Sequence, residues 1–114
     1  MEATPREVRI YITKDGKRPF KTWLNSLKDI KAVTKIERRL ERLEIGNFGD
    51  VRSVGNGVLE LRIDYGPGYR VYFGQWGTKI VLLLCGGDKS TQEQDITKAQ
   101  AYWEDYRIRE NANK

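Results

Sequence analysis

Two arginines, Arg62 and Arg70, flank a glycine- and proline-containing turn in the stretch LRIDYGPGYRVYF, residues 61–73. Apolar and polar residues alternate on both sides of this turn, which predicts two strands that pair antiparallel. Because successive side chains of a strand point to opposite faces, Glu60 and Arg62 share one face with Arg70 and Tyr72 of the next strand. The pattern therefore predicts an open sheet face that carries two guanidinium groups. Replacing Arg70 with Ala on such an exposed face should cost about 0.5 kcal/mol or less.

A third cation, Lys89, follows the last apolar run of the chain, directly after Gly86-Gly87-Asp88. The missing side chains of the two glycines would let a ligand approach the backbone at the end of that strand. Guanidinium groups bind phosphate oxygens in a bidentate way, and cations stabilise charge that develops at phosphorus. Together, Arg62, Arg70 and Lys89 predict one cleft that suits a phosphodiester.

The same residues also have a simpler interpretation, which composition and spacing leave open. Alternating charges are ordinary on the solvated face of an antiparallel sheet, where Arg62 would pair with Glu60 or Asp64. Tyr72 would then be a packing or rim residue, and Cys85 a small buried apolar residue. The glycine pair lacks the Lys-Ser/Thr pattern of a phosphate-binding P-loop and would simply end a strand.

The elements that position these residues are predicted in the order strand, helix, helix, three strands, helix. Pro19 suits the first turn of a helix, and Ser90 with Glu93 forms a capping box that would begin the last helix. The apolar run at residues 80–85 is typical of a strand covered on both faces, in the middle of the sheet. The expected strands lie at residues 8–13, 58–64, 69–75 and 79–85, and the expected helices at 19–27, at 30–45 and from Ser90 to about Tyr106, before a polar tail.

Length and charge limit the class of protein. The 114 residues, 39% of them hydrophobic, predict a single domain (residues 1–114) with a small core. The net charge of +5 favours a polyanion or an acidic protein as partner. Much of this charge lies on the outer face of the second helix, which is either solvated and paired with glutamates or in contact with ribosomal RNA. The residues concerned are Lys31, Lys35, Arg38, Arg39 and Arg42, with Glu37, Glu41 and Glu44 as the possible pairing partners.

Other residue types exclude several kinds of site. The single cysteine, Cys85, cannot form an internal disulfide, and the absence of histidine removes the common zinc spacings, so we expect no metal and no cofactor. Residues Met1–Val8 contain no apolar leader, and no run approaches the roughly 18 to 20 apolar residues of a membrane span. We therefore expect a cytoplasmic protein with no membrane partner.

Three stretches together resemble the RelE/ParE superfamily, the toxins of type II toxin–antitoxin modules. The resemblance runs from about Ile10 to Tyr106 and is most similar to the HigB-like branch of addiction-module killer proteins. It implies an α+β, RelE-like fold with two N-terminal helices packed on a twisted, mainly antiparallel four-stranded sheet, and a C-terminal helix. The stretches are FKTWLNSLKDIKAVTKIERRLERLEIGNFGD, VLELRIDYGPGYRVYF and IVLLLCGGDKSTQEQDITKAQAYWEDY.

The resemblance also implies an activity and partners. Such toxins are ribosome-dependent, metal-independent endoribonucleases that cut mRNA in the A site of the 70S ribosome, and a HigA-like helix-turn-helix antitoxin neutralises them. The arginine of their Gly-Tyr-Arg turn contacts the scissile phosphate, and here it is Arg70; Lys89 matches a basic residue that would stabilise the transition state or supply a proton. Glu60 stands where RelE-type toxins have a lysine, and Asp95 lies near the position of their C-terminal catalytic tyrosine.

Metal-free RNA cleavage sets the roles that these residues would fill. It needs a base for the 2′-hydroxyl, stabilisation of the phosphorane and an acid for the 5′-oxygen. We assign Arg70 and Arg62 to the phosphate, Lys89 to charge stabilisation or general acid catalysis, and Tyr72 or Glu60 to proton transfer. Two other classes stay open: a ParE-like poison of DNA gyrase, and a non-catalytic module that binds RNA or protein.

Overall fold

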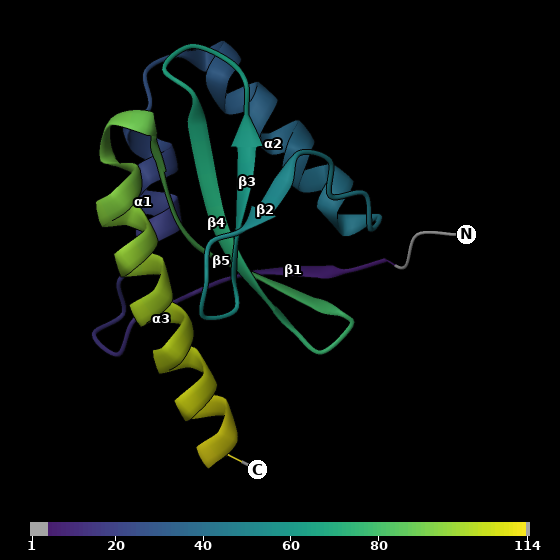
Figure 1. Cartoon of the computed structure of the whole chain (residues 1–114), viewed down its shortest axis with the longest axis vertical. Helices are drawn as coiled ribbons and strands as arrows, with labels where there is room; N and C mark the ends of the chain where they lie inside the picture. The colour runs from purple at the N-terminus through teal and green to yellow at the C-terminus, as the bar shows by residue number, and fades with distance from the viewer. Residues whose placement is uncertain (1–4, 114) are drawn as a thin grey trace.

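The computed structural model describes residues 5–113, in which a five-stranded mixed sheet carries helices on both faces (Figure 1). No helix in this range is long and apolar enough to cross a membrane. The elements in chain order are β1 (Glu7–Ile10), α1 (Pro19–Ser26), α2 (Ile30–Glu44), β2 (Val51–Ser53), β3 (Val58–Ile63), β4 (Tyr69–Trp76), β5 (Ile80–Asp88), a 3-10 turn (Lys89–Thr91) and α3 (Gln92–Ala112).

The sheet has the strand order β1-β5-β4-β3-β2. The first strand runs parallel to β5, whereas the other neighbouring strands pair antiparallel. Sequence alternation missed β2, because a strand of three residues is too short to display a period. It also extended β1 too far: that strand ends at Ile10, and Ile12 is 40% exposed instead of buried. The α+β class and the antiparallel β3–β4–β5 meander are as predicted.

The helices α1 and α2 both contribute buried residues to the core on one face of the sheet. Pro19 opens α1, where its fixed φ suits the first turn and its missing N–H costs nothing. The side chain of Asp29 caps α2 by accepting hydrogen bonds from two backbone N–H groups of the first turn. The buried core on this face includes Phe20, Leu24, Ala32, Ile36, Leu43, Leu61, Ile63, Val71, Phe73, Val81 and Leu83.

The opposite face is covered by α3, which packs its Ala99 and Trp103 against β3, β4 and β5. Gly74 allows this approach, because a Cβ there would lie 2.4 Å from the Trp103 ring. The predicted capping box is wrong: α3 begins at Gln92 after a 3-10 turn, and no side chain caps it at Thr91. The predicted end of this helix near Tyr106 is also wrong, since the helix continues through the polar residues that follow, to Ala112.

The strand β5 is an internal strand with apolar residues on both faces, as its unbroken apolar sequence predicts. Helix α1 packs against it from one side and α3 from the other. The face that the sequence predicts to be open and polar is therefore the face on which α3 lies. This coverage determines what the candidate site residues can contact.

Candidate functional site

The predicted arrangement of the two strands is confirmed by their register. Arg62 of β3 lies directly opposite Arg70 of β4, and Glu60 lies opposite Tyr72. These four side chains share the α3 face, because Leu61 and Val71 between them belong to the core under α1 and α2. The alternation of the sequence therefore places the four residues correctly relative to one another.

The prediction that this face is open is wrong. Glu60 and Tyr72 are each 0% exposed and Arg70 is 5% exposed, because the first turns of α3 lie over them. Arg62 keeps 42% of its side chain exposed, and Lys89 is exposed. Strand periodicity shows which residues share a face of the sheet, but it cannot show that a later helix covers that face. The sequence therefore failed to predict that these side chains are buried.

Glu60 is the centre of a buried polar network. Its Oε1 lies 2.8 Å from Nε of Arg52, while its Oε2 accepts hydrogen bonds from the Tyr72 hydroxyl at 3.0 Å and from the Gln92 amide at 2.8 Å. Burial alone would raise the pKa of this carboxyl, but the hydrogen bonds from Gln92, Arg52 and Tyr72 outweigh it and hold the pKa below its usual range. Glu60 is therefore ionised at neutral pH.

Arg70 lies beside this carboxylate with donors to spare. Its Nη1 donates to the carbonyl of Tyr69 at 3.0 Å. Its Nε lies 3.8 Å from Oε1 of Glu60, which is an ion-pair distance but too long for a hydrogen bond. This buried Nε has no hydrogen-bond partner within residues 5–113. A buried donor without a partner is uncommon, and one explanation is an anion that the site binds.

The environments of Tyr72 and Glu60 do not favour proton transfer. Burial, together with the neighbouring charge of Glu60, raises the pKa of the Tyr72 phenol far above its usual range, so this hydroxyl stays protonated. Both oxygens of Glu60 are already engaged, and its lowered pKa makes it a weak base. The geometry instead suits Glu60 to balancing the charge of Arg70, and Tyr72 to holding the Glu60 carboxylate in place.

Lys89 stands in the 3-10 turn that joins β5 to α3. Its aliphatic chain runs across Gly68 in the β3–β4 turn, where a Cβ would lie only 3.0 Å from Cγ and Cε of the lysine. Gly68 also has φ +80°, so a side chain there is disfavoured on two grounds. The contact holds Lys89 beside the turn that leads into β4.

Arg62 pairs with neither Glu60 nor Asp64, the two partners of the simpler interpretation. Its Nε lies 3.8 Å from Asp50, in the segment just before β2. This is a long, half-exposed pair that holds the guanidinium only weakly. Arg62 therefore remains able to turn toward a ligand.

The basic face of α2 contains one arginine with a structural role. Arg39 donates to the carbonyls of Arg62, Phe48 and Asp50 and thereby ties α2 to the β2–β3 region. Within residues 5–113, none of the predicted glutamate partners on α2 forms an ion pair. Of the remaining cations of this face, Lys35 lies over the Tyr65 ring, 5.2 Å from its centroid, and Lys31, Arg38 and Arg42 are exposed.

Two members of the network escaped sequence reasoning. Arg52 lies on β2, a strand whose alternation is too short to recognise, and Gln92 stands at the first position of α3. The sequence could not show that Arg52 lies opposite Glu60, because this register is set by the pairing of β2 with β3. A buried glutamate on an apolar strand is the sequence feature that could have prompted a search for its partners.

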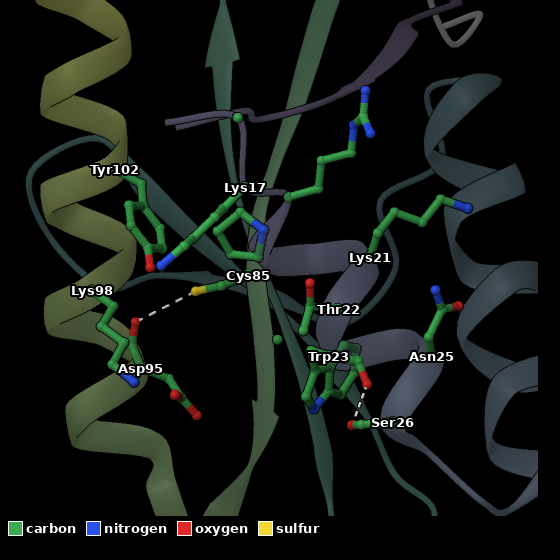
Figure 2. Close-up of a pocket in the computed structure, with 14 residues that line it drawn as sticks. Lys17, Lys21, Thr22, Trp23, Asn25, Ser26, Cys85, Asp95, Lys98 and Tyr102 are labelled. Carbon is green, nitrogen blue, oxygen red and sulfur yellow. Dashed lines mark hydrogen bonds between the residues drawn. The ribbon is translucent and has the colours of Figure 1, made fainter. Parts of the chain in front are cut away.

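A large cavity among the described residues does not contain the five predicted site residues. It is a groove of about 710 Å³ between α1 and α3, over the end of β5 (Figure 2). Cys85 lies at its base, 6% exposed as predicted, and burial raises the pKa of its thiol to about 12. The groove is lined by residues of α1, β5 and α3 and of the segment just before α1: Gly16, Lys17, Arg18, Pro19, Lys21, Thr22, Trp23, Asn25, Ser26, Cys85, Gly86, Asp95, Lys98 and Tyr102.

The fold and the site define an α+β protein in which arginine and lysine residues gather at one end of a mixed sheet, beside the start of the C-terminal helix. Residues 22–104 match the family described as Phage derived protein Gp49-like (DUF891), and the chain belongs to this family. The Gp49-like family is a RelE/Gp49-type toxin family, associated with the toxins of toxin–antitoxin modules.

The chain is also similar to a protein of Haemophilus influenzae (strain ATCC 51907 / DSM 11121 / KW20 / Rd) that is described as uncharacterized. The two are 54% identical over 81 residues, which cover 71% of this chain and 82% of that protein. The toxin-family resemblance seen in the sequence is thus confirmed at the family level, and its HigB-like branch stays a prediction.

Proposed function

We propose that this protein is the toxin of a type II toxin–antitoxin module, of the HigB-like branch, and that it cuts mRNA on the ribosome without a metal ion. The observation that carries the proposal is Arg70. Its guanidinium is held beside the ionised Glu60, yet the buried Nε has no hydrogen-bond partner within the described residues. A preorganised cation with unused donors is suited to stabilising charge on a phosphodiester.

In this proposal three cations act on the phosphate. Arg70 binds a non-bridging oxygen through the donors that the Tyr69 carbonyl leaves unused, Nε among them, and Arg62 supports it from the neighbouring strand. Lys89, exposed at the end of β5, neutralises charge at the leaving 5′-oxygen or donates a proton to it. Glu60 and Tyr72 keep Arg70 in place. The ribosome holds the message in line, which can itself supply several kcal/mol, so no strong base is required of the protein.

The proposed partners follow from the family and the charge. A cognate antitoxin of the HigA-like helix-turn-helix type would bind the toxin and block either the phosphate site or entry to the ribosome. The net charge of +5 favours an acidic partner surface, which accelerates association and strengthens the complex at low salt. We expect the complex to survive purification in moderate salt and co-expression to restore growth.

Induced expression of the chain without a partner tests the proposal. We expect incorporation of labelled amino acids to stop while the supercoiling of plasmid DNA is unchanged. Loss of supercoiling with an SOS response would instead support a ParE-like gyrase poison. Unimpaired protein synthesis after induction would leave only a non-catalytic binding module and would overturn the proposed function.

A further inference from the structure

The groove between α1 and α3 has cationic walls. Lys98 projects from α3, and Lys21 projects from the side of α1 that faces away from α3; both are exposed (Figure 2). Neither forms an ion pair with a carboxylate of residues 5–113, and the same holds for Arg18 at the start of α1. Asp95 is the one carboxylate among the described lining residues. A cavity of about 710 Å³ with this excess of unpaired positive charge suits a polyanion.

Two aromatic side chains add a second property to the same groove. Trp23 packs its ring against Gly86, where a Cβ would lie 2.2 Å from the indole, so the glycine sets the depth of the groove. Tyr102 is held from behind by Tyr11, with ring centroids 5.0 Å apart. Grooves that bind single-stranded nucleic acid combine cations along the backbone with aromatic rings on which bases stack.

Asp95 indicates which of two kinds of polyanion, an acidic peptide or RNA, the groove suits better. Its side chain is 8% exposed, and its Oδ2 accepts a hydrogen bond from the Thr91 hydroxyl. An acidic peptide would bring carboxylates toward this group and be repelled. A nucleobase would instead bring amino groups that can donate to it, while its phosphates reach the lysines. The charge pattern of the groove therefore favours RNA over an acidic peptide.

The groove also adjoins the proposed phosphate site. Gly87, which follows the groove residue Gly86, lies directly opposite Arg70 in the β4–β5 pairing. The start of α3 contacts both places, since Gln92 bonds to Glu60 and Asp95 lines the groove. Adjacent strands are about 5 Å apart, a distance that one nucleotide can bridge.

We infer that the groove between α1 and α3 binds the single-stranded RNA next to the scissile phosphodiester, with phosphates on Lys21 and Lys98 and a base against Trp23 or Tyr102. This inference rests on the proposed nuclease function but concerns a different set of residues. It makes Lys21 and Lys98 binding residues that contribute affinity for the substrate, separate from the residues that act on the phosphate.

The test measures binding without cleavage. The probe is a fluorescent 2′-O-methyl RNA of about 12 nucleotides, which lacks the nucleophilic hydroxyl, and the readout is anisotropy at about 50 to 200 mM salt. The double variant Lys21→Glu/Lys98→Glu should bind at least about tenfold more weakly and show a salt slope smaller by about 1.4, from two lost phosphate contacts. Both lysines are exposed on helix surfaces, so circular dichroism should show an unchanged fold.

The matched control is Lys31→Glu/Lys79→Glu, which changes the net charge equally at exposed lysines outside the groove. It should retain most of the affinity of the parent protein. Equal weakening by the two double variants overturns the inference, as does displacement of the RNA by a polyglutamate peptide at a lower concentration than by unlabelled RNA.

Cleavage of message on translating ribosomes is measured in parallel. The parent protein should cut message. If it does, and the groove variant binds the probe and cuts message as well as the control variant, the RNA-binding role of the groove is refuted and the proposed nuclease activity still stands. A parent protein that cuts no message refutes the nuclease, and the binding comparison still decides whether the groove holds RNA.

Discussion

Replacing Glu60 with Gln should destabilise the protein strongly, because it removes the charge that balances a buried arginine. The amide offers one acceptor where the carboxylate serves Arg52, Tyr72 and Gln92, and it removes the only ion-pair partner that Arg70 has within residues 5–113. Arg52 is half exposed and can turn to water, so most of the cost falls on Arg70. Breaking a buried pair costs roughly 3 to 5 kcal/mol, and the 3.8 Å separation here argues for the lower end, about 3 kcal/mol.

Urea denaturation followed by tryptophan fluorescence measures this loss, which corresponds to a decrease of about 10 °C in Tm. The control Asp64→Asn changes an exposed carboxylate at the end of the same strand and should stay within about 0.5 kcal/mol of the parent. The difference between parent and Glu60→Gln should be complete above pH 4.5, the ordinary pKa of the carboxyl, and should shrink as the pH falls through the lowered folded pKa. A Glu60→Gln protein as stable as the Asp64→Asn control at pH 7 would refute the buried network.

Three further expectations concern stability and reactivity. Tyr11→Phe removes the 2.6 Å hydrogen bond to Asp105 and should cost about 1 kcal/mol in urea denaturation. Burial and this bond raise the pKa of Tyr11 to about 12. The stability difference between parent and Tyr11→Phe should therefore be present below pH 10 and vanish as the pH rises through 12. The Cys85 thiol should react with iodoacetamide at pH 8 only at the rate of unfolding, since burial raises its pKa to about 12; rapid alkylation of the folded protein would contradict its burial. Gly74→Ala should cost about 1 to 3 kcal/mol in thermal unfolding, because the new methyl group meets the ring of Trp103, and an unchanged Tm would show that α3 does not press on β4.

Most of the arrangement of the sheet could be predicted from local pattern. The turn after Asp64 and the alternation around it place Arg62 opposite Arg70, and the unbroken apolar run of β5 predicts an internal strand. Both features follow from residues close together in the chain. The short strand β2 has no such pattern, so its pairing was not predicted, and neither was the ion pair between its Arg52 and Glu60.

The burial of the site could not be predicted in the same way. It depends on where α3 packs, which is decided by contacts such as Trp103 against Gly74 between distant segments. The same long-range packing creates the groove, because residues of α1 and α3 line one cavity only when the two helices flank β5. The expectation that Arg70→Ala would cost little assumed an exposed side chain, and Arg70 is 5% exposed. Losing the contacts of a buried guanidinium should instead cost about 1 to 3 kcal/mol.

For this reason Arg70→Lys tests the site better than Arg70→Ala. Lysine keeps a positive charge near Glu60, but it lacks the planar fork that binds phosphate in a bidentate way. The exposed Arg107→Lys on α3 is the matched control. Both variants should fold, as judged by circular dichroism and tryptophan fluorescence.

The most direct measurement is the rate at which these folded proteins cut a purified message on translating 70S ribosomes in EDTA-free buffer. Primer extension detects the cut ends. We predict that Arg70→Lys cuts about a hundred- to a thousandfold more slowly than the parent, the loss typical of removing one preorganised donor to developing charge. Arg107→Lys should cut at the parental rate. An Arg70→Lys protein that is folded and cuts as fast as the parent would contradict the central claim that Arg70 holds the scissile phosphate.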